Sequence, residues 1–195
     1  MNLDKMAEKY RDTGFINRGG SGMEIIRAIE EDYKSIRSFY NHVIDNTKGM
    51  EKYARWIKGM HPSDSIISKY IEEDAMYMLI NEGKNIGAMA VTMSQTEDYH
   101  PIKWEIDVRD DEVSVIHILA VDPDYQGKGI GKRMIDEALR LSREKGKLSC
   151  RLDALSTNIP AQKMYESKGF ELRGQQYWYA ENTGWTDFYL YEYVL

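Results

Sequence analysis

The stretch VSVIHILAVDPDYQGKGIGKR, residues 113–133, decides the fold of this chain. Its first nine residues are almost continuously apolar, interrupted only by Ser114 and His117, which is typical of a strand buried in the centre of a sheet. An Asp-Pro pair ends that strand, and residues 129–145 then carry apolar side chains at helical spacing. The pattern predicts a central strand, a glycine-rich turn and an amphipathic helix.

The turn QGKGIG, residues 126–131, lies between this strand and this helix. Several of its backbone N–H groups can therefore point outward at the positive end of the helix, which makes a seat for a pyrophosphate group. A side chain at Gly127, Gly129 or Gly131 would hold the phosphate away from the main chain. A tight strand-to-helix turn explains the same glycines without a ligand, so the glycine cluster alone leaves phosphate binding open.

Two other phosphate-binding motifs do not fit this turn. A Walker loop would need Gly in place of Gln126 and Ser or Thr in place of Arg133. A dinucleotide fingerprint would need Gly or Ala in place of Lys132 or Met134, depending on where it began.

The segments outside this stretch add further strands and helices. On the N-terminal side, hydrophobic periodicity and turn residues predict strands at 23–28, 75–80, 85–93 and 104–108, with helices at 31–44, 50–58 and from about 64. On the C-terminal side they predict strands at 148–155, 171–179 and 187–194 and a helix at 160–167. The order indicates a mixed α/β chain with helices interleaved between the strands of one sheet.

The length of 195 residues allows one substantial core and leaves no room for a second full domain. Residues 1–22 are polar and end in RGGSG, so we interpret them as a flexible appendage. Residues 23–195 then form the single folded domain.

Composition narrows the class of function. No apolar run approaches the roughly 20 residues that cross a bilayer, and the first residues lack the pattern of a secretory signal, so we expect neither a membrane partner nor export. With Cys150 alone no internal disulfide can form, which favours the cytoplasm. The net charge of -6 disfavours binding to the phosphate backbone of nucleic acids and favours binding of a cationic substrate. The four histidines show no paired metal-ligand spacing, so we expect no metal.

Two motifs together resemble one known family. Residues 119–133 resemble motif A of the GNAT superfamily of acetyl-CoA-dependent N-acetyltransferases, whose core is Gln/Arg-x-x-Gly-x-Gly/Ala. Residues 158–170, NIPAQKMYESKGF, resemble the family's other hallmark, an Asn, then a helix bearing Tyr, then Gly-Phe opening a strand. The matches cover residues 113–172 in the right order, and their joint occurrence is far more specific than either alone.

The resemblance implies a single domain of mixed α+β type with a twisted, mostly antiparallel sheet whose central strands splay apart between helices. It implies acetyl-CoA as cosubstrate, with the pantetheine arm pairing against one strand like a further strand and the pyrophosphate on the turn. Dimerisation is common in the family. The cofactor-binding residues implied are Leu119, Ala120, Val121, Gln126, Gly127, Lys128, Gly129, Ile130, Gly131, Lys132 and Asn158.

The resemblance also implies catalytic residues. Tyr165 would lie beside the thioester sulfur and give the departing thiolate its proton. Some family members carry a Glu base where this chain has Val115, so the base is open. His117 stands where arylalkylamine acetyltransferases carry a histidine, although a hydrogen-bonded histidine in the sheet explains it equally well. Glu105 or Asp107, acting through water, is a weaker candidate.

We therefore expect an N-acetyltransferase that moves the acetyl group to a primary amine of a small molecule or peptide by direct attack. The alternatives are a catalytically silent CoA-binding sensor of the same fold and an unrelated interaction domain with a coincidental glycine turn. The acceptor site is expected near Trp56, His61 and Tyr70, with residues 99–104 and the terminal strands. Tyr189, Tyr191 and Tyr193 alternate on one face of the last predicted strand, and such a stripe is typical of side chains that pack in the core.

Overall fold

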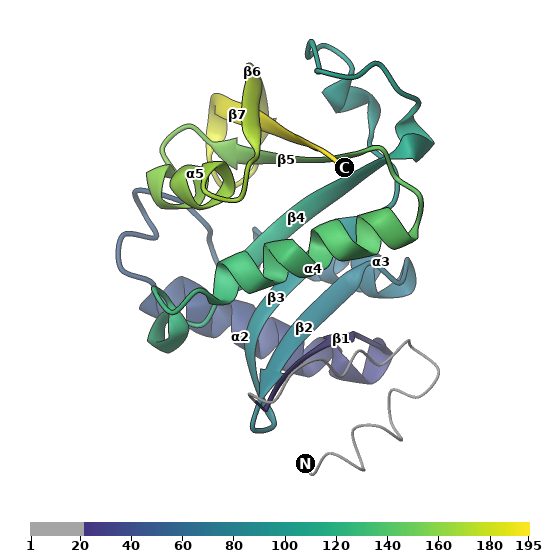
Figure 1. Ribbon diagram of the computed structural model, residues 1–195. Helices are drawn as coiled ribbons and strands as arrows, with labels where there is room; N and C mark the ends of the chain where they lie inside the picture. Colours follow the sequence, from purple (N-terminus) through teal and green to yellow (C-terminus); the bar gives the residue numbers. More distant parts are fainter. Residues whose placement is uncertain (1–21) are drawn as a thin grey trace.

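Seven strands form one sheet in the order β1-β2-β3-β4-β5-β7-β6 in the computed structural model, which describes residues 22–195 (Figure 1). All neighbouring strands are antiparallel except β4 and β5, which run parallel, so the sheet is mixed and mostly antiparallel as expected. The strands are β1 (Met23–Arg27), β2 (Met76–Asn81), β3 (Lys84–Thr92), β4 (Val113–Val121), β5 (Ser149–Leu155), β6 (Glu171–Ala180) and β7 (Gly184–Val194).

Helices cover both faces of the sheet. Because successive strand residues point to opposite faces, neighbours in β2 serve different cores: Leu79 packs under α4 (Ile130–Glu144) and α5 (Ile159–Glu166). Met78 packs instead under α2 (Tyr33–Asn46) and α3 (Asp64–Glu72). Figure 1 shows α4 crossing in front of β3 and β4, with α2 behind the sheet.

The two central strands separate halfway along their length. Strands β4 and β5 pair from Val113 with Ser149 to Ile116 with Leu152, and not beyond. Both strands continue past that point, so the sheet opens between the second half of β4 and the end of β5. The splay that the family resemblance implies is confirmed, and it creates space inside the sheet.

A bulge sits in β4 where the splay begins. Ala88 pairs with Ala120 and Ala90 with His117, so Ile118 and the residue after it face a single residue of β3. Ile118 has a φ of 44°, a conformation that costs free energy for a β-branched residue. Tyr40 of α2 steadies the bulge because its hydroxyl donates a hydrogen bond of 2.8 Å to the Ile118 carbonyl.

Two of the predicted elements are wrong. Residues 50–58 form a series of turns instead of a helix, since Gly49, Arg55 and Gly59 adopt positive φ and interrupt any helical run. Residues 104–108 form no strand. Trp104 donates its indole N–H to the Tyr99 carbonyl, and the alternation there reflects side chains that cover the sheet.

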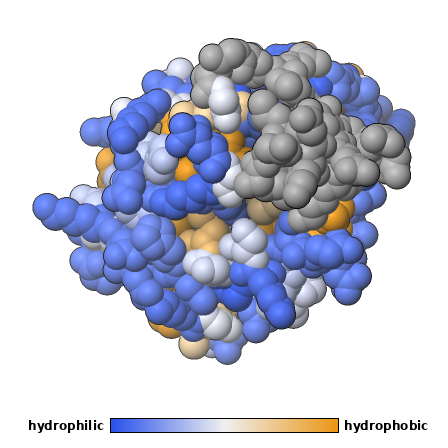
Figure 2. Space-filling view, turned by 90° about the horizontal axis from the view of Figure 1, so that it is seen from below, coloured by the Kyte–Doolittle hydropathy of each residue, from blue (hydrophilic) through white to orange (hydrophobic). Residues whose placement is uncertain are grey.

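The other predicted strands and helices are confirmed within a few residues at each end. The proposed appendage, residues 1–22, lies outside the described residues apart from Gly22. No helix in the described part of the chain is long and apolar enough to cross a membrane. The face in Figure 2 is mostly hydrophilic, with small hydrophobic patches between polar side chains.

Candidate active site

A groove of about 510 Å³ runs along β4, the start of α4 and the start of α5. Residues 47–56, which include most of the series of turns at 50–58, form the opposite wall of the groove. Of the eleven predicted cofactor-binding residues, ten line this groove: Leu119, Ala120, Val121, Gln126, Gly127, Gly129, Ile130, Gly131, Lys132 and Asn158.

The turn before α4 leaves its backbone open toward the groove. Gly127 has a φ of 73° and Gly129 a φ of 80°, so both positions favour glycine. A Cβ at either residue would meet nothing within 4 Å, which leaves room for a ligand beside the main chain. Because the first N–H groups of a helix have no carbonyl one turn earlier, the start of α4 offers donors and a positive end to an anion.

Close packing gives a further reason for glycine at position 131. A Cβ there would lie 2.5 Å from the Met164 sulfur and 3.7 Å from Val121. Gly131 therefore permits α4 and α5 to approach each other, and a side chain at this residue would require Met164 to shift.

Three polar residues of the motifs are held by the protein itself. The Gln126 amide donates to the Val121 carbonyl over 3.2 Å, which fixes the turn onto β4. Asn158 caps α5 by accepting the Ala161 N–H, at 3.4 Å. Lys128 does not line the groove, since its ammonium group donates to the Asp124 carbonyl at 2.8 Å.

A second, smaller space of about 250 Å³ lies where the sheet splays, and we call it the inner cavity. It meets the groove at Leu119, Asn158 and Met164, which line both spaces. Its remaining walls come from the middle of β4, from α3 and α5, from the ends of β5 and β6, from β7 with the turn before it, and from residues 54–61. The inner cavity includes Trp56, His61, Tyr70, His117, Asp153 and Tyr165.

Tyr165 reaches the inner cavity from α5. The residue is 7% exposed, and within residues 22–195 its hydroxyl has no hydrogen-bond partner. Burial, with the nearby charge of Asp153, raises the pKa of Tyr165 well above its usual value. The side chain is therefore a neutral phenol that can donate a proton to a group in the cavity.

His117 lies on the wall of the same cavity. Its ring stacks on Tyr70 with centroids 5.4 Å apart, and Nε2 lies 3.2 Å from the Thr92 hydroxyl. Burial, together with the charge of Lys69, lowers the pKa of His117 to about 4. Burial lowers the pKa of His61 to about 4 as well. Both imidazoles are thus neutral at pH 7.

Asp153 is a site residue that the sequence analysis missed. It lies near the end of β5, lines the inner cavity and accepts the Tyr99 hydroxyl at 2.7 Å. Burial raises its pKa. The available signal was that Arg151 and Asp153, two charged residues, alternate in a strand predicted to lie within the sheet, which places both on one face.

The weaker base candidates lie elsewhere. Glu105 pairs with Arg173 at 3.0 Å, and both Glu105 and Asp107 line a separate cavity beside Arg151. Among the terminal tyrosines, Tyr191 is 1% exposed and belongs to the core, as predicted for a packing stripe.

Four known families or proteins resemble this chain. A model of the Acetyltransferase (GNAT) family matches residues 26–170. An uncharacterized N-acetyltransferase of Methanocaldococcus jannaschii is 25% identical over 143 residues, which is 73% of this chain but only 54% of that protein, so the chain spans about half of its length. A GNAT-family acetyltransferase of Listeria monocytogenes superposes with a TM-score of 0.67 at 24% identity, over 93% of this chain and 100% of that one. A structure from Salmonella typhimurium, solved with its cofactor acetyl-CoA, has a TM-score of 0.65 at 20% identity, over 89% and 94% of the two chains.

Proposed function

This chain belongs to the GNAT acetyltransferase family, and we propose that it transfers the acetyl group of acetyl-CoA to a primary amine of a small molecule or peptide by direct attack. One observation carries the proposal: the groove with its open helix start joins the inner cavity, where a phenol and a carboxylate line one small space.

Acetyl-CoA is the cosubstrate of this family and supplies an acetyl thioester. The open turn fits a diphosphate, because the main chain at Gly127 and Gly129 is uncovered and α4 begins there. Leu119 and Val121, which line the groove, would pair with the pantetheine arm through their backbone. Lys132 at the groove would add a positive charge near the diphosphate.

The bulge in β4 supplies backbone N–H groups near the join of the two spaces. Register with β3 is lost between Ala88 and Ala90, and Leu119 lies opposite this break. A backbone donor there suits the negative charge that develops on a carbonyl oxygen during acyl transfer. The Tyr40 hydrogen bond to Ile118 holds this part of the chain in place.

Tyr165 would protonate the departing sulfur. A thiol has a reference pKa of about 8.5, so a neutral phenol can assist its departure, and such general-acid steps contribute about 100- to 10,000-fold in rate. In the balanced reaction the C–S bond breaks, the C–N bond forms, and the ammonium loses two protons, one retained in the thiol product and one released to solvent.

A CoA-binding sensor without turnover is the alternative of the same fold. Titration calorimetry with acetyl-CoA tests the groove, and thiol release with a panel of polyamines, amino acids, aminoglycosides and short peptides tests turnover. Binding together with amine-dependent thiol release supports the enzyme. Binding without release from any amine supports the sensor, and no binding contradicts both.

We also propose a cytoplasmic location. The chain has one cysteine, Cys150, and an unpaired cysteine is typical of proteins in a reducing compartment. Its thiol is buried, and burial raises its pKa to about 11, so the group is shielded and unreactive. Fractionation of cells that express the tagged chain tests this proposal.

A further inference from the structure

The lining of the inner cavity contains very few residues of charged type. Among the described residues that line it there are no Lys or Arg side chains, and the two histidines are neutral at pH 7 because burial lowers the pKa of each to about 4. Asp153 is the one acidic side chain among these described lining residues. The other walls are aromatic, aliphatic or uncharged polar groups, including Trp56 and Phe188.

Asp153 is held in place by Tyr99 of the 3-10 turn η3 (Glu97–Tyr99). Tyr99 is 4% exposed and donates its hydroxyl to the Asp153 Oδ1 over 2.7 Å. An ionised carboxylate has about four acceptor positions, so this bond leaves most of them available. A carboxylate in such surroundings is costly unless a cation pairs with it.

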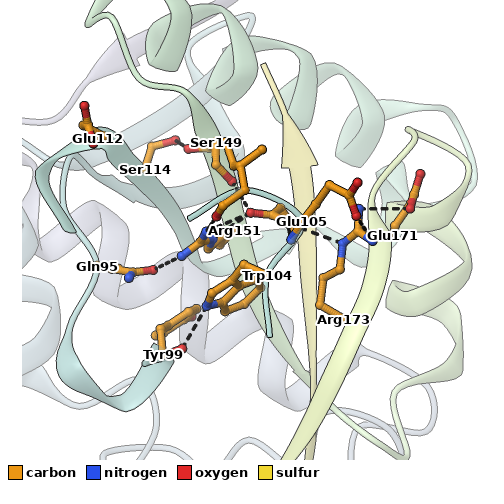
Figure 3. Close-up of polar contacts among 12 residues, drawn as sticks. Gln95, Tyr99, Trp104, Glu105, Glu112, Ser114, Ser149, Arg151, Glu171 and Arg173 are labelled. Atoms are coloured by element: carbon orange, nitrogen blue, oxygen red, sulfur yellow. Dashed lines mark hydrogen bonds and ion pairs between the residues drawn. The ribbon is translucent and has the colours of Figure 1, made fainter. Parts of the chain in front are cut away.

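The segment that carries Tyr99 is anchored on the same face of β5. Arg151 donates to the Gln95 amide oxygen at 2.7 Å and pairs with Glu192 at 2.8 Å. Its guanidinium lies 4.0 Å from the Trp104 ring centroid, and Trp104 donates to the Tyr99 carbonyl at 2.9 Å. Figure 3 shows this chain of contacts from Gln95 through Arg151 and Trp104 to Tyr99.

We propose that Asp153 binds the ammonium group of the acceptor and takes its first proton, and that the inner cavity selects primary amines with no carboxylate beside the reacting nitrogen. This inference rests on the proposed function. In the step, an N–H bond of the ammonium breaks and an O–H bond forms on Asp153, which leaves a neutral amine with a free lone pair. The proton returns to solvent when the product leaves.

The preference for amines without a neighbouring acid follows from charge. A free amino acid would bring its carboxylate toward Asp153 in a space where none of the described lining residues is Lys or Arg. Two carboxylates close together in a partly desolvated site repel each other strongly. The same molecule with its acid converted to an amide keeps the amine and loses the repulsion. Burial, which raises the pKa of Asp153, also makes the carboxylate a better proton acceptor than an exposed one.

The test compares the parent with Asp153→Asn, which keeps the size of the side chain and its acceptor for Tyr99. Asp111→Asn is the matched control, because Asp111 is exposed and its carboxylate pairs with Arg109 at 3.0 Å, away from the inner cavity. Two readouts are needed: binding of 1,4-diaminobutane by calorimetry without acetyl-CoA, and thiol release with alaninamide and with alanine.

The proposal expects three results. In Asp153→Asn, binding of 1,4-diaminobutane weakens at least about tenfold, and kcat/KM for alaninamide falls on the order of 100-fold or more. In the parent, kcat/KM is at least about tenfold higher for alaninamide than for alanine. Asp153→Asn loses this preference. The Asp111→Asn control keeps the parent's values.

The failures of the two proposals are distinguishable. If the parent turns over amines while Asp153→Asn binds and reacts as well, the role of Asp153 is overturned and the acetyltransferase proposal stands. If the parent turns over no amine, the acetyltransferase proposal fails, and the diamine titration alone decides whether Asp153 is an ammonium site.

Tyr99→Phe tests the positioning role. The groups that face Asp153 are Tyr70 of α3, Tyr99 and Asp98 of η3, Tyr165 of α5 and His117 of β4. The Tyr99 hydrogen bond favours the ionised carboxylate, so its removal raises the pKa of Asp153 and moves the acid limb of the pH–rate profile upward by about one unit. An unmoved limb contradicts the assignment of that limb to Asp153.

Discussion

Gly131 of α4 and Met164 of α5 pack so closely that a methyl group on Gly131 would lie 2.5 Å from the Met164 sulfur. This contact matters for the site because both residues line the groove, and Met164 also lines the inner cavity. The distance between the two helices is therefore coupled to the shape of both spaces.

Gly131→Ala is expected to lower the free energy of unfolding by about 1–3 kcal/mol, because the added methyl group overpacks the contact. It should also weaken acetyl-CoA binding as Met164 is pushed into the groove. Urea denaturation and calorimetry measure the two effects. Combined with Met164→Ala, the cost of Gly131→Ala should shrink, and strictly additive losses would contradict a direct contact.

Tyr165→Phe is expected to lower kcat by about 100- to 10,000-fold while leaving acetyl-CoA affinity close to that of the parent, since only the hydroxyl is removed. Steady-state kinetics and calorimetry separate the two quantities. Tyr191→Phe is the control, because this tyrosine lies in the core and its hydroxyl contacts Glu166 instead of the inner cavity. Equal turnover in Tyr165→Phe and the parent would remove Tyr165 as proton donor.

His61 and His117 should make the fold sensitive to acid. Both have folded-state pKa values near 4, below the reference value of 6.5, so the unfolded chain binds more protons between these limits. The stability they contribute is complete above pH 6.5 and is lost as the pH falls toward 4. Urea denaturation across this range should show a shallower decline in a His61→Gln/His117→Gln variant. An identical decline in both proteins would contradict the depressed pKa values.

His117→Gln should leave the midpoints of the pH–rate profile between pH 6 and pH 8 unchanged. An imidazole with a pKa near 4 does not titrate in that range, so the residue would act as a neutral wall of the inner cavity. A midpoint in this range that disappears in the variant would identify His117 as the base.

Glu192→Gln is expected to destabilise the fold by about 3–5 kcal/mol, because it leaves Arg151 buried without its counter-charge. Arg151 is 1% exposed. Glu73→Gln, which alters an exposed pair with Lys69, should cost less than about 1 kcal/mol. Urea denaturation compares the two, and a cost for Glu192→Gln as small as that of the control would contradict the importance of the buried pair.

The sequence predicted well where local pattern and tertiary role agree. The run 113–121, the hairpin through Glu82 and Gly83, and the helix begun by Ser63 each follow from periodicity and turn residues, and each is present. It failed at 50–58 and 104–108, where apolar residues recur because they cover other parts of the molecule. The spacing of apolar residues in the sequence does not distinguish a loop that covers the core from a helix or a strand.

By itself, the sequence determined the family, the order of the principal elements and the turn that faces the groove, because those features depend on residues close together in the chain. Only the tertiary structure decided that Tyr99 holds Asp153, that Asp153 and Tyr165 line one cavity, and that Gly131 packs against Met164. The Tyr99–Asp153 and Gly131–Met164 contacts join residues 54 and 33 positions apart, and their geometry is set by how strands splay and helices pack.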